Sequence, residues 1–179
     1  MFEIPNSYFV IPVMEALLQL LASLSITYTR YDHKAVFTCE ESEGLDTPIP
    51  GAHTKQLLMK ATNKEIYVLA IVMHDKQVDT KALAKDFGAQ SFSFASAERL
   101  MEMMKLTPGS VTPFGLIHDT EHKIQVVVDE DAWNTGVFRF HPMINTATLV
   151  IEKPAFEAFM KHTGHGFTVR KIPQKTVVA

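Results

Sequence analysis

The chain has 179 residues, of which 46% are hydrophobic, so it has the length of one domain and enough apolar surface for one sizeable core. The formal net charge of −3 excludes the broad basic surface of a protein that coats DNA, although a small contact with a nucleic-acid end is compatible with it. The sequence has one cysteine, no basic-then-apolar leader pattern and no apolar run near ~18 residues. We therefore expect a cytoplasmic protein without a membrane span.

The N-terminal quarter predicts a helix followed by two short elements. Apolar residues recur at helical spacing over residues 13–24, which predicts a helix with one buried stripe. A short β-like piece is expected at residues 26–31. Thr38 and Glu41 have the spacing of a capping box, which predicts a brief helix that ends near Gly44.

A loop and a hairpin are expected next. Residues 46–51 (DTPIPG) contain two prolines and a glycine, which are typical of a surface loop. Strands near residues 57–60 and 65–73 flank the polar pair Asn63 and Lys64 and predict a hairpin. The second strand is almost continuously apolar, so we expect it to be central and buried on both faces.

The second half of the chain mixes helices and strands. Capping residues and helix-ending glycines predict helical segments at residues 79–88, 96–104, 129–134 and 154–164. Strands are expected at residues 115–118 and 123–128, around Phe138 and Phe140, and at residues 146–151 and 167–172. The elements do not alternate strictly as βαβ units and show no repeat. The sequence therefore predicts one α+β domain around a mixed sheet.

General catalytic and metal-binding motifs are missing from the sequence. No phosphate-binding G-x-x-x-x-G-K-[ST] loop or dinucleotide G-x-G-x-x-G motif occurs, and Gly109 with Ser110 lacks the second glycine of a G-x-S-x-G elbow. His162 and His165 lie three residues apart, but without an H-E-x-x-H context or a cysteine cluster they are expected to be solvated surface histidines. We expect no metal ion and no cofactor.

Three segments resemble the signatures of the ProX/YbaK family, the editing domains of prolyl-tRNA synthetases and their freestanding relatives. They are residues 53–58 (HTKQLL), 107–116 (TPGSVTPFGL) and 140–148 (FHPMINTAT). Tyr31, His33 and Thr38, followed by Glu40 and Glu41, suit the N-terminal pattern of the family, and the resemblance runs from about residue 18 to residue 165. The second and third segments in combination are specific, because runs of this length are improbable by chance.

The resemblance implies a single editing domain over residues 1–171, with residues 172–179 as a flexible tail. The implied fold is α+β, with a mixed, largely antiparallel, barrel-like sheet surrounded by helices. The implied reaction is hydrolysis of the ester of a mischarged tRNA. Within the family, the likeness is to freestanding proteins that remove alanine from the tRNA for proline.

The resemblance also assigns the site residues. Lys55, Gly109, Ser110 and His141 are the implied catalytic residues, and Gln56, Val111, Thr112, Pro113, Asn145 and Thr146 are the implied substrate-binding residues. Lys55 would hold the terminal phosphate or ribose, and the backbone N–H groups of residues 109–113, here called the glycine loop, would approach the ester. The family usually has asparagine where this chain has Gln56, which bears on fine substrate preference more than on the reaction class.

An aminoacyl ester is an activated bond, so its hydrolysis needs positioning and modest electrostatic help more than a strong nucleophile. The resemblance implies that the neighbouring ribose hydroxyl of the substrate and a water molecule supply the rest. The implied partner is the acceptor end of an aminoacyl-tRNA, and prolyl-tRNA synthetase or an elongation factor are protein partners that the family suggests. Three alternatives stay open: another amino acid such as cysteine or serine, a non-catalytic tRNA- or synthetase-binding module, and a domain for an unrelated ligand.

Overall fold

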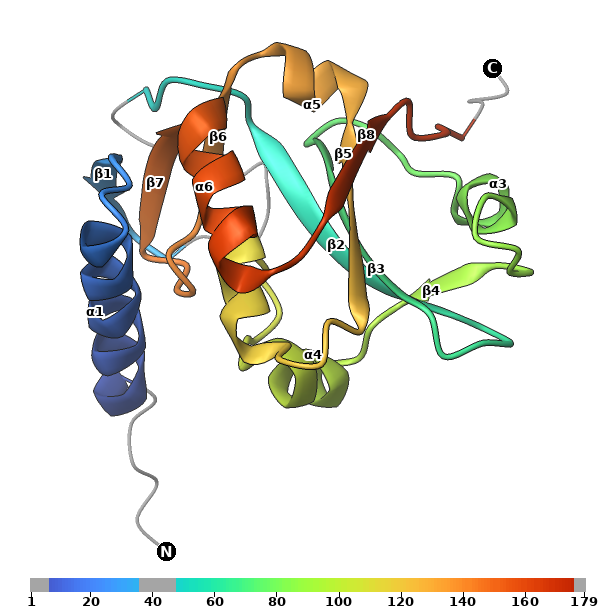
Figure 1. The fold of residues 1–179 in the computed structure, drawn as a ribbon, viewed down its shortest axis with the longest axis horizontal. Coiled ribbons are helices and arrows are strands. Elements are labelled where there is room, and N and C mark those ends of the chain that lie inside the picture. The colour runs from blue at the N-terminus through green and yellow to red at the C-terminus, as the bar shows by residue number, and fades with distance from the viewer. Residues whose placement is uncertain (1–6, 36–47, 176–179) are drawn as a thin grey trace, which may run out of the picture.

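The computed structural model describes residues 7–35 and 48–175, which fold into the expected mixed α+β domain (Figure 1). The described strands are β1 (Thr29–Asp32), β2 (Thr54–Ala61), β3 (Tyr67–Met73), β4 (Phe92–Phe94), β5 (Ile124–Asp129), β6 (Val137–Phe140), β7 (Ala147–Glu152) and β8 (Phe167–Arg170). The described helices are α1 (Ser7–Ser23), α3 (Thr80–Lys85), α4 (Ala97–Met104), the 3-10 helix η1 (Pro113–His118), α5 (Glu130–Asn134) and α6 (Lys153–Thr163). The brief helix expected at residues 38–44 lies outside the described residues.

The strands are arranged in two sheets. An antiparallel three-stranded sheet has the order β1-β7-β6, and a mixed five-stranded sheet has the order β4-β2-β3-β5-β8, in which β3 pairs with β5 and β5 with β8 in parallel. A parallel bridge between Ala52 and Phe138 joins the start of β2 to β6. The two sheets therefore meet where β2 begins.

The expected hairpin and central strand are confirmed. β2 pairs antiparallel with β3, and β3 lies between β2 and β5 with six of its seven residues buried. However, β2 begins at Thr54, three residues earlier than expected, so Lys55 and Gln56 lie within a strand and not in the loop before it.

Most helix boundaries follow the capping residues that the sequence shows. The side chain of Asp79 accepts from the backbone N–H groups of Lys81 and Ala82 at the start of α3. Ser96 caps α4, and Gly164 ends α6 with a positive φ of 74°. Among the described helices, none has both the length and the apolar character needed to cross a lipid bilayer.

The prediction of a strand at residues 115–118 is wrong, because this segment belongs to the 3-10 helix η1. Pro113 occupies the first turn, where a missing N–H costs nothing, and the Thr112 hydroxyl accepts from the N–H of Phe114 at 3.5 Å. Pro113, Phe114 and Leu116 of η1 are buried, as apolar residues of a strand would be, and Ile117 is half-buried. Periodicity alone does not separate these two outcomes for so short a run.

Two further differences concern β4 and the C-terminus. The three-residue strand β4 was not predicted; it pairs with β2 through Phe94 and Met59. Residues 172–175, which we expected to begin a flexible tail, are docked instead. Ile172 is buried, and Gln174 forms a bridge with Val78. The domain therefore extends beyond the expected boundary at residue 171.

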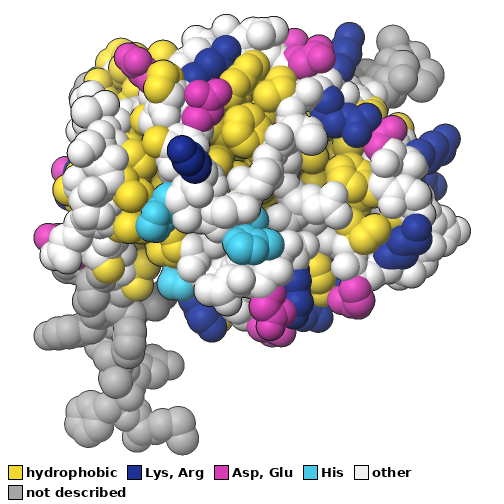
Figure 2. Space-filling view, viewed as in Figure 1, with side chains coloured by type: hydrophobic (Ala, Val, Ile, Leu, Met, Phe, Trp, Pro, Cys, Tyr) yellow, Lys and Arg dark blue, Asp and Glu magenta, His cyan; other side chains and the backbone are white. Residues whose placement is uncertain are grey.

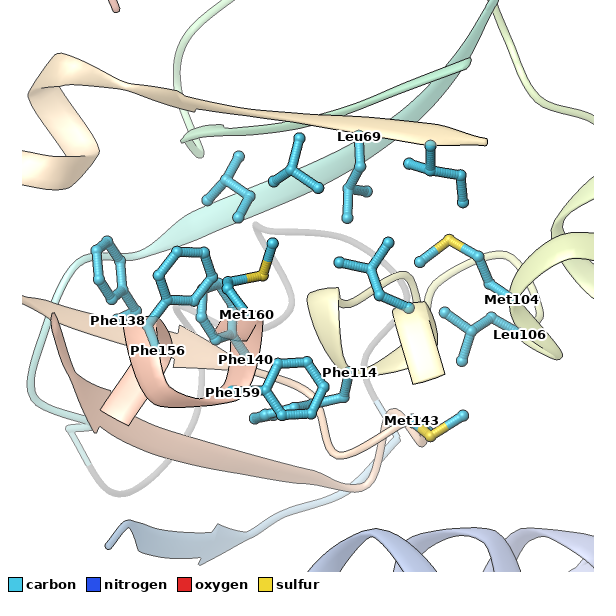
Figure 3. Close-up of a cluster of buried hydrophobic side chains, with 14 of the residues drawn as sticks. Leu69, Met104, Leu106, Phe114, Phe138, Phe140, Met143, Phe156, Phe159 and Met160 are labelled. Carbon is cyan, nitrogen blue, oxygen red and sulfur yellow. The ribbon is translucent and has the colours of Figure 1, made fainter. Parts of the chain in front are cut away.

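The main core lies between the two sheets, and α6 packs into it (Figure 3). Phe156, Phe159 and Met160 of α6 belong to one buried cluster with side chains from both sheets, including Phe138 and Leu69. Because side chains alternate along a strand, the opposite face of the five-stranded sheet carries a second set, which packs under α3. This alternation decides which residues of β2 and β6 are available outside the main core.

Candidate functional site

Lys55 and Arg139 lie on the side of the sheets that faces away from the main core. Phe138 and Leu58 belong to that core, so the residues that alternate with them point to the opposite side. The bridge between Ala52 and Phe138 aligns β2 with β6, and bridged residues share a face. We call this side the outer face and define it by Lys55, Arg139, His141 and Thr148.

His141 follows β6 at the edge of the outer face. Its Nδ1 lies 2.9 Å from the carbonyl oxygen of Ala147, and because a carbonyl only accepts, the ring donates through Nδ1. Burial lowers the pKa of His141, with a smaller lowering from His33, although the Ala147 hydrogen bond opposes the shift. The imidazole is therefore neutral at pH 7, and its Nε2 is a hydrogen-bond acceptor.

His33 and Thr148 complete this part of the site. Thr148 alternates with Leu149 of the main core, so its hydroxyl lies on the outer face, 2.9 Å from Nε2 of His33. The ring of His33 lies 6.0 Å from that of His141, centroid to centroid. The sequence analysis placed His33 only in a family pattern, and it did not single out Thr148 or Arg139.

Gln56 lies on the other side of β2 from Lys55. Its amide Nε2 donates to the hydroxyl of Thr54 at 2.8 Å, and that hydroxyl donates to the carbonyl oxygen of Arg139 at 3.3 Å. Gln56 thus helps to join β2 to β6, close to His141. Lys55 is half-buried, and within the described part of the chain it forms no ion pair.

The glycine loop approaches β6 from the main-core side. Gly109 has a φ of +85°, which favours glycine, and Ser110 and Thr112 are buried. Val111 is half-buried against the main core, and Pro113 is the first residue of η1. The described residues show no hydrogen bond from this loop to Lys55 or His141.

Aromatic contacts connect the glycine loop to β6. The ring of Phe114, which follows the loop, lies 6.1 Å from the ring of Phe140, which precedes His141. Asn145 and Thr146 lie in the connection between β6 and β7, where Asn145 is half-buried and Thr146 is exposed. The carbonyl oxygen of Thr146 accepts from the backbone N–H of His33 at 3.0 Å. The three segments that carry the family resemblance therefore meet around the end of β6.

His165 corrects one expectation of the sequence analysis. It is not a solvated surface histidine, because it is buried and its Nε2 lies 3.1 Å from a carboxylate oxygen of Asp119, whereas His162 is exposed. Asp119 also accepts from the backbone N–H groups of Lys123 and Ile124. Within the described ranges, no group of three or more His, Cys, Asp or Glu residues could hold a metal ion.

Surface charge is mixed on the face of the molecule that Figure 2 shows. On the face drawn in Figure 2, the basic and acidic side chains are interspersed and do not form one basic patch. A near-neutral, mixed surface suits a ligand that makes few phosphate contacts. The chemistry of the outer face is that of such a site: a lysine cation, a neutral imidazole and a buried hydroxyl.

Comparison with known proteins identifies relatives. Residues 33–159 match the model of the aminoacyl-tRNA editing domain. The chain is 32% identical to the prolyl-tRNA editing protein ProX of Acetoanaerobium sticklandii over 86% of this chain and 93% of that protein. It is 36% identical to prolyl-tRNA synthetase associated domain-containing protein 1 of Bos taurus, over 84% of this chain and 90% of that protein.

Two further matches are more distant. The multifunctional Ser/Thr-tRNA deacylase ProXp-y of Escherichia coli K12 is 27% identical, over 82% of this chain and 92% of that protein. A solved structure of a protein proposed to be a trans-editing enzyme for prolyl-tRNA synthetase superposes with a TM-score of 0.68 at 17% identity, covering 92% of this chain and 98% of that chain. At that identity, the structural match shows a shared fold.

Proposed function

The chain belongs to the family of aminoacyl-tRNA editing domains, and from this premise we propose that it hydrolyses mischarged aminoacyl-tRNA in trans, with alanine on the tRNA for proline as its substrate. The observation that carries the proposal is the placement of Lys55 and His141 on one outer face, at the junction of β2 and β6. The cytoplasm is the proposed place of action, and the acceptor end of the tRNA is the proposed partner.

The proposed reaction uses position and charge. Lys55 holds the terminal phosphate or ribose, because its ammonium lies on a strand and forms no ion pair with the described residues, so it can bind an anion. Nε2 of His141 accepts a hydrogen bond from the ammonium group or a ribose hydroxyl of the substrate, since Nδ1 is already bound to Ala147. A water molecule then attacks the ester carbonyl, and backbone N–H groups of residues 109–113 stabilise the negative charge that develops on the carbonyl oxygen. The bond between the carbonyl carbon and the ribose oxygen breaks, and a proton from the water passes to that oxygen, which leaves the free amino acid and a ribose hydroxyl.

Size exclusion gives the proposed selectivity. A pocket that fits alanine rejects proline by a steric clash, whereas one methylene in an apolar pocket changes binding by only about 1–3 kcal/mol. Gln56 is one methylene longer than the asparagine usual in the family, and its amide is engaged by Thr54. One N–H of this amide is thus committed to Thr54, so Gln56 acts on pocket shape through β2.

A second candidate substrate is serine or threonine esterified to tRNA. The E. coli relative, whose name assigns it to Ser/Thr-tRNA, supports this alternative at 27% identity. Cysteine on the tRNA for proline is a third candidate. A non-catalytic module that binds tRNA, prolyl-tRNA synthetase or an elongation factor is the candidate from another class.

The test is a deacylation assay with alanyl-, prolyl-, cysteinyl-, seryl- and threonyl-tRNA. The wild type is compared with Lys55→Ala and with Lys60→Ala, a control on the same strand whose ammonium is paired with Glu65 at 2.6 Å. Rapid loss of alanine that depends on Lys55 but not on Lys60, and that spares proline, supports the proposal. Preferential loss of another amino acid replaces the substrate, and the absence of any hydrolysis favours the binding module.

A further inference from the structure

Arg139 differs from every other arginine of the chain. All four arginines lie in the described residues, and three of them form ion pairs at 2.6–2.7 Å: Arg30 with Asp32, Arg99 with Glu102 and Arg170 with Asp86. Arg139 has no carboxylate partner in the described part of the chain. A half-buried guanidinium without a counter-charge lowers the stability of the fold. A bound anion that supplies the counter-charge would explain why an arginine stands at this position.

One hydrogen bond orients the side chain of Arg139. Its Nε donates to the carbonyl oxygen of Pro50 at 3.1 Å, which leaves the two terminal amino groups of the guanidinium directed elsewhere. Burial lowers the pKa of Arg139, but the pKa of a guanidinium lies so far above neutrality that the group stays charged at pH 7. The Pro50 contact orients the fork without neutralising it.

Lys55 and Arg139 face the same side of adjacent strands. The bridge between Ala52 and Phe138 places His53 beside Arg139, and Lys55 lies two residues further along β2. With a strand separation of about 4.8 Å and a rise of about 3.3 Å per residue, the two Cα atoms lie roughly 8 Å apart. Two long cationic side chains at that spacing can reach one anion between them.

We infer that Arg139 and Lys55 together form an anion site that binds the phosphate on the 5′ side of the terminal nucleotide of the tRNA. This inference rests on the proposed function, because it identifies the part of that substrate which the outer face holds. The planar fork of Arg139 suits two oxygens of one phosphate, and Lys55 supplies a mobile point charge. Arg139 is thus a binding residue, distinct from the groups that act on the ester.

The test compares two small substrates that differ only in the phosphate. One is adenosine with alanine on its ribose, and the other is adenosine 5′-monophosphate with the same ester. For the wild type, the phosphate is expected to improve kcat/KM by about tenfold or more, as for a charge-assisted hydrogen bond. In Arg139→Gln that gain disappears, while kcat/KM for the substrate without phosphate changes less than about twofold.

The control is Arg99→Gln, which removes a charge of the same type on α4. It is expected to keep the full phosphate effect. Equal loss of activity on both substrates in Arg139→Gln would overturn the inference, since it would mean that Arg139 only supports the chain at Pro50. If the wild type hydrolyses no aminoacyl ester at all, the proposed function fails instead, so the two failures are distinguishable.

Salt dependence gives a second readout on the full tRNA. Loss of one phosphate contact on a single strand is expected to reduce the slope of log binding constant against log salt by about 0.7. Arg139→Lys keeps the charge and is expected to retain most of the slope but a higher KM, because it lacks the fork. An unchanged slope in Arg139→Gln, with a melting temperature equal to that of the wild type, would contradict the anion site.

Discussion

The imidazole of His141 donates its Nδ1 proton to the carbonyl oxygen of Ala147 across 2.9 Å, which fixes the tautomer of a residue at the end of β6. Neutral histidine in water favours the other tautomer, with the proton on Nε2. We predict that neutral His141 carries its proton on Nδ1, which ¹⁵N chemical shifts of the ring will show. A neutral ring protonated on Nε2 would remove the proposed acceptor for the substrate.

Acid is expected to destabilise the fold through His141. Burial is the main cause of its lowered pKa, so the unfolded chain binds a proton before the folded chain does. Stability contributed by the neutral ring is therefore present above pH 6.5 and falls as pH decreases below it, by up to about 1.4 kcal/mol per pH unit. Thermal melts between pH 7.5 and 5.5 should show a smaller loss for His141→Gln than for the wild type or for His162→Gln. Equal losses in all three would disprove this.

Thr148→Val tests the hydrogen bond between the hydroxyl of Thr148 and the ring of His33. Nδ1 of His33 donates to the carbonyl oxygen of Lys34 at 2.8 Å, and Nε2 of His33 lies 2.9 Å from the hydroxyl of Thr148. Replacing this hydroxyl by a methyl group should lower the free energy of unfolding by about 1 kcal/mol. The deacylation rate should fall about fivefold, because the ring of His33 becomes more mobile beside His141. Thr168→Val, an exposed position on β8, is the control. A Thr148→Val protein with wild-type stability and rate would show that this hydrogen bond is dispensable.

Gly115→Ala should destabilise the segment that carries the glycine loop. An added Cβ would lie 2.7 Å from Cδ1 of Leu106 and 3.0 Å from Cβ of Met104, which is too close for either neighbour to accommodate without moving. Overpacking of this kind costs about 1–3 kcal/mol. Gly166→Ala, where no atom lies within 4 Å of the added Cβ, is the matched control. Chemical denaturation of the pair measures the difference, and equal midpoints would refute the prediction.

Lys76→Met should remove one partner of a buried ion pair. The ammonium of Lys76 lies 2.6 Å from Asp129, which is fully buried and also accepts from the backbone N–H of Ile172. Burial alone lowers the pKa of Lys76, but hydrogen bonds to Asp129 and Asp131 outweigh burial and raise it. Without the ammonium of Lys76, the buried carboxylate of Asp129 should lower the free energy of unfolding by about 3–5 kcal/mol.

The control for Lys76→Met is Lys123→Met, because the pair between Lys123 and Glu121 is exposed and should contribute less than about 1 kcal/mol. The docked segment at residues 172–175 should also become sensitive to proteases in Lys76→Met, since Asp129 holds its first residue. Similar losses of stability in both variants would show that Asp129 is tolerated without its partner.

Local sequence determined the elements whose signals are contained within a few residues. The caps at Asp79 and Ser96, the αL glycine at Gly164 and the unbroken apolar run of β3 each satisfy backbone groups or bury side chains in a way that neighbouring residues decide. The family resemblance likewise depended on short contiguous segments. The α+β class and the family that the three segments indicate were therefore readable from sequence.

The tertiary structure alone decided which of those residues share a face. Register between β1 and β7 brings His33 to Thr148, 115 residues away, and the bridge from Ala52 to Phe138 puts Arg139 on the same side as Lys55 while Gln56 turns inward. It also made residues 113–118 a 3-10 helix and docked Ile172. Pairing between distant segments depends on how whole surfaces pack, and a shift of one residue reverses every side chain, so no local pattern specifies it.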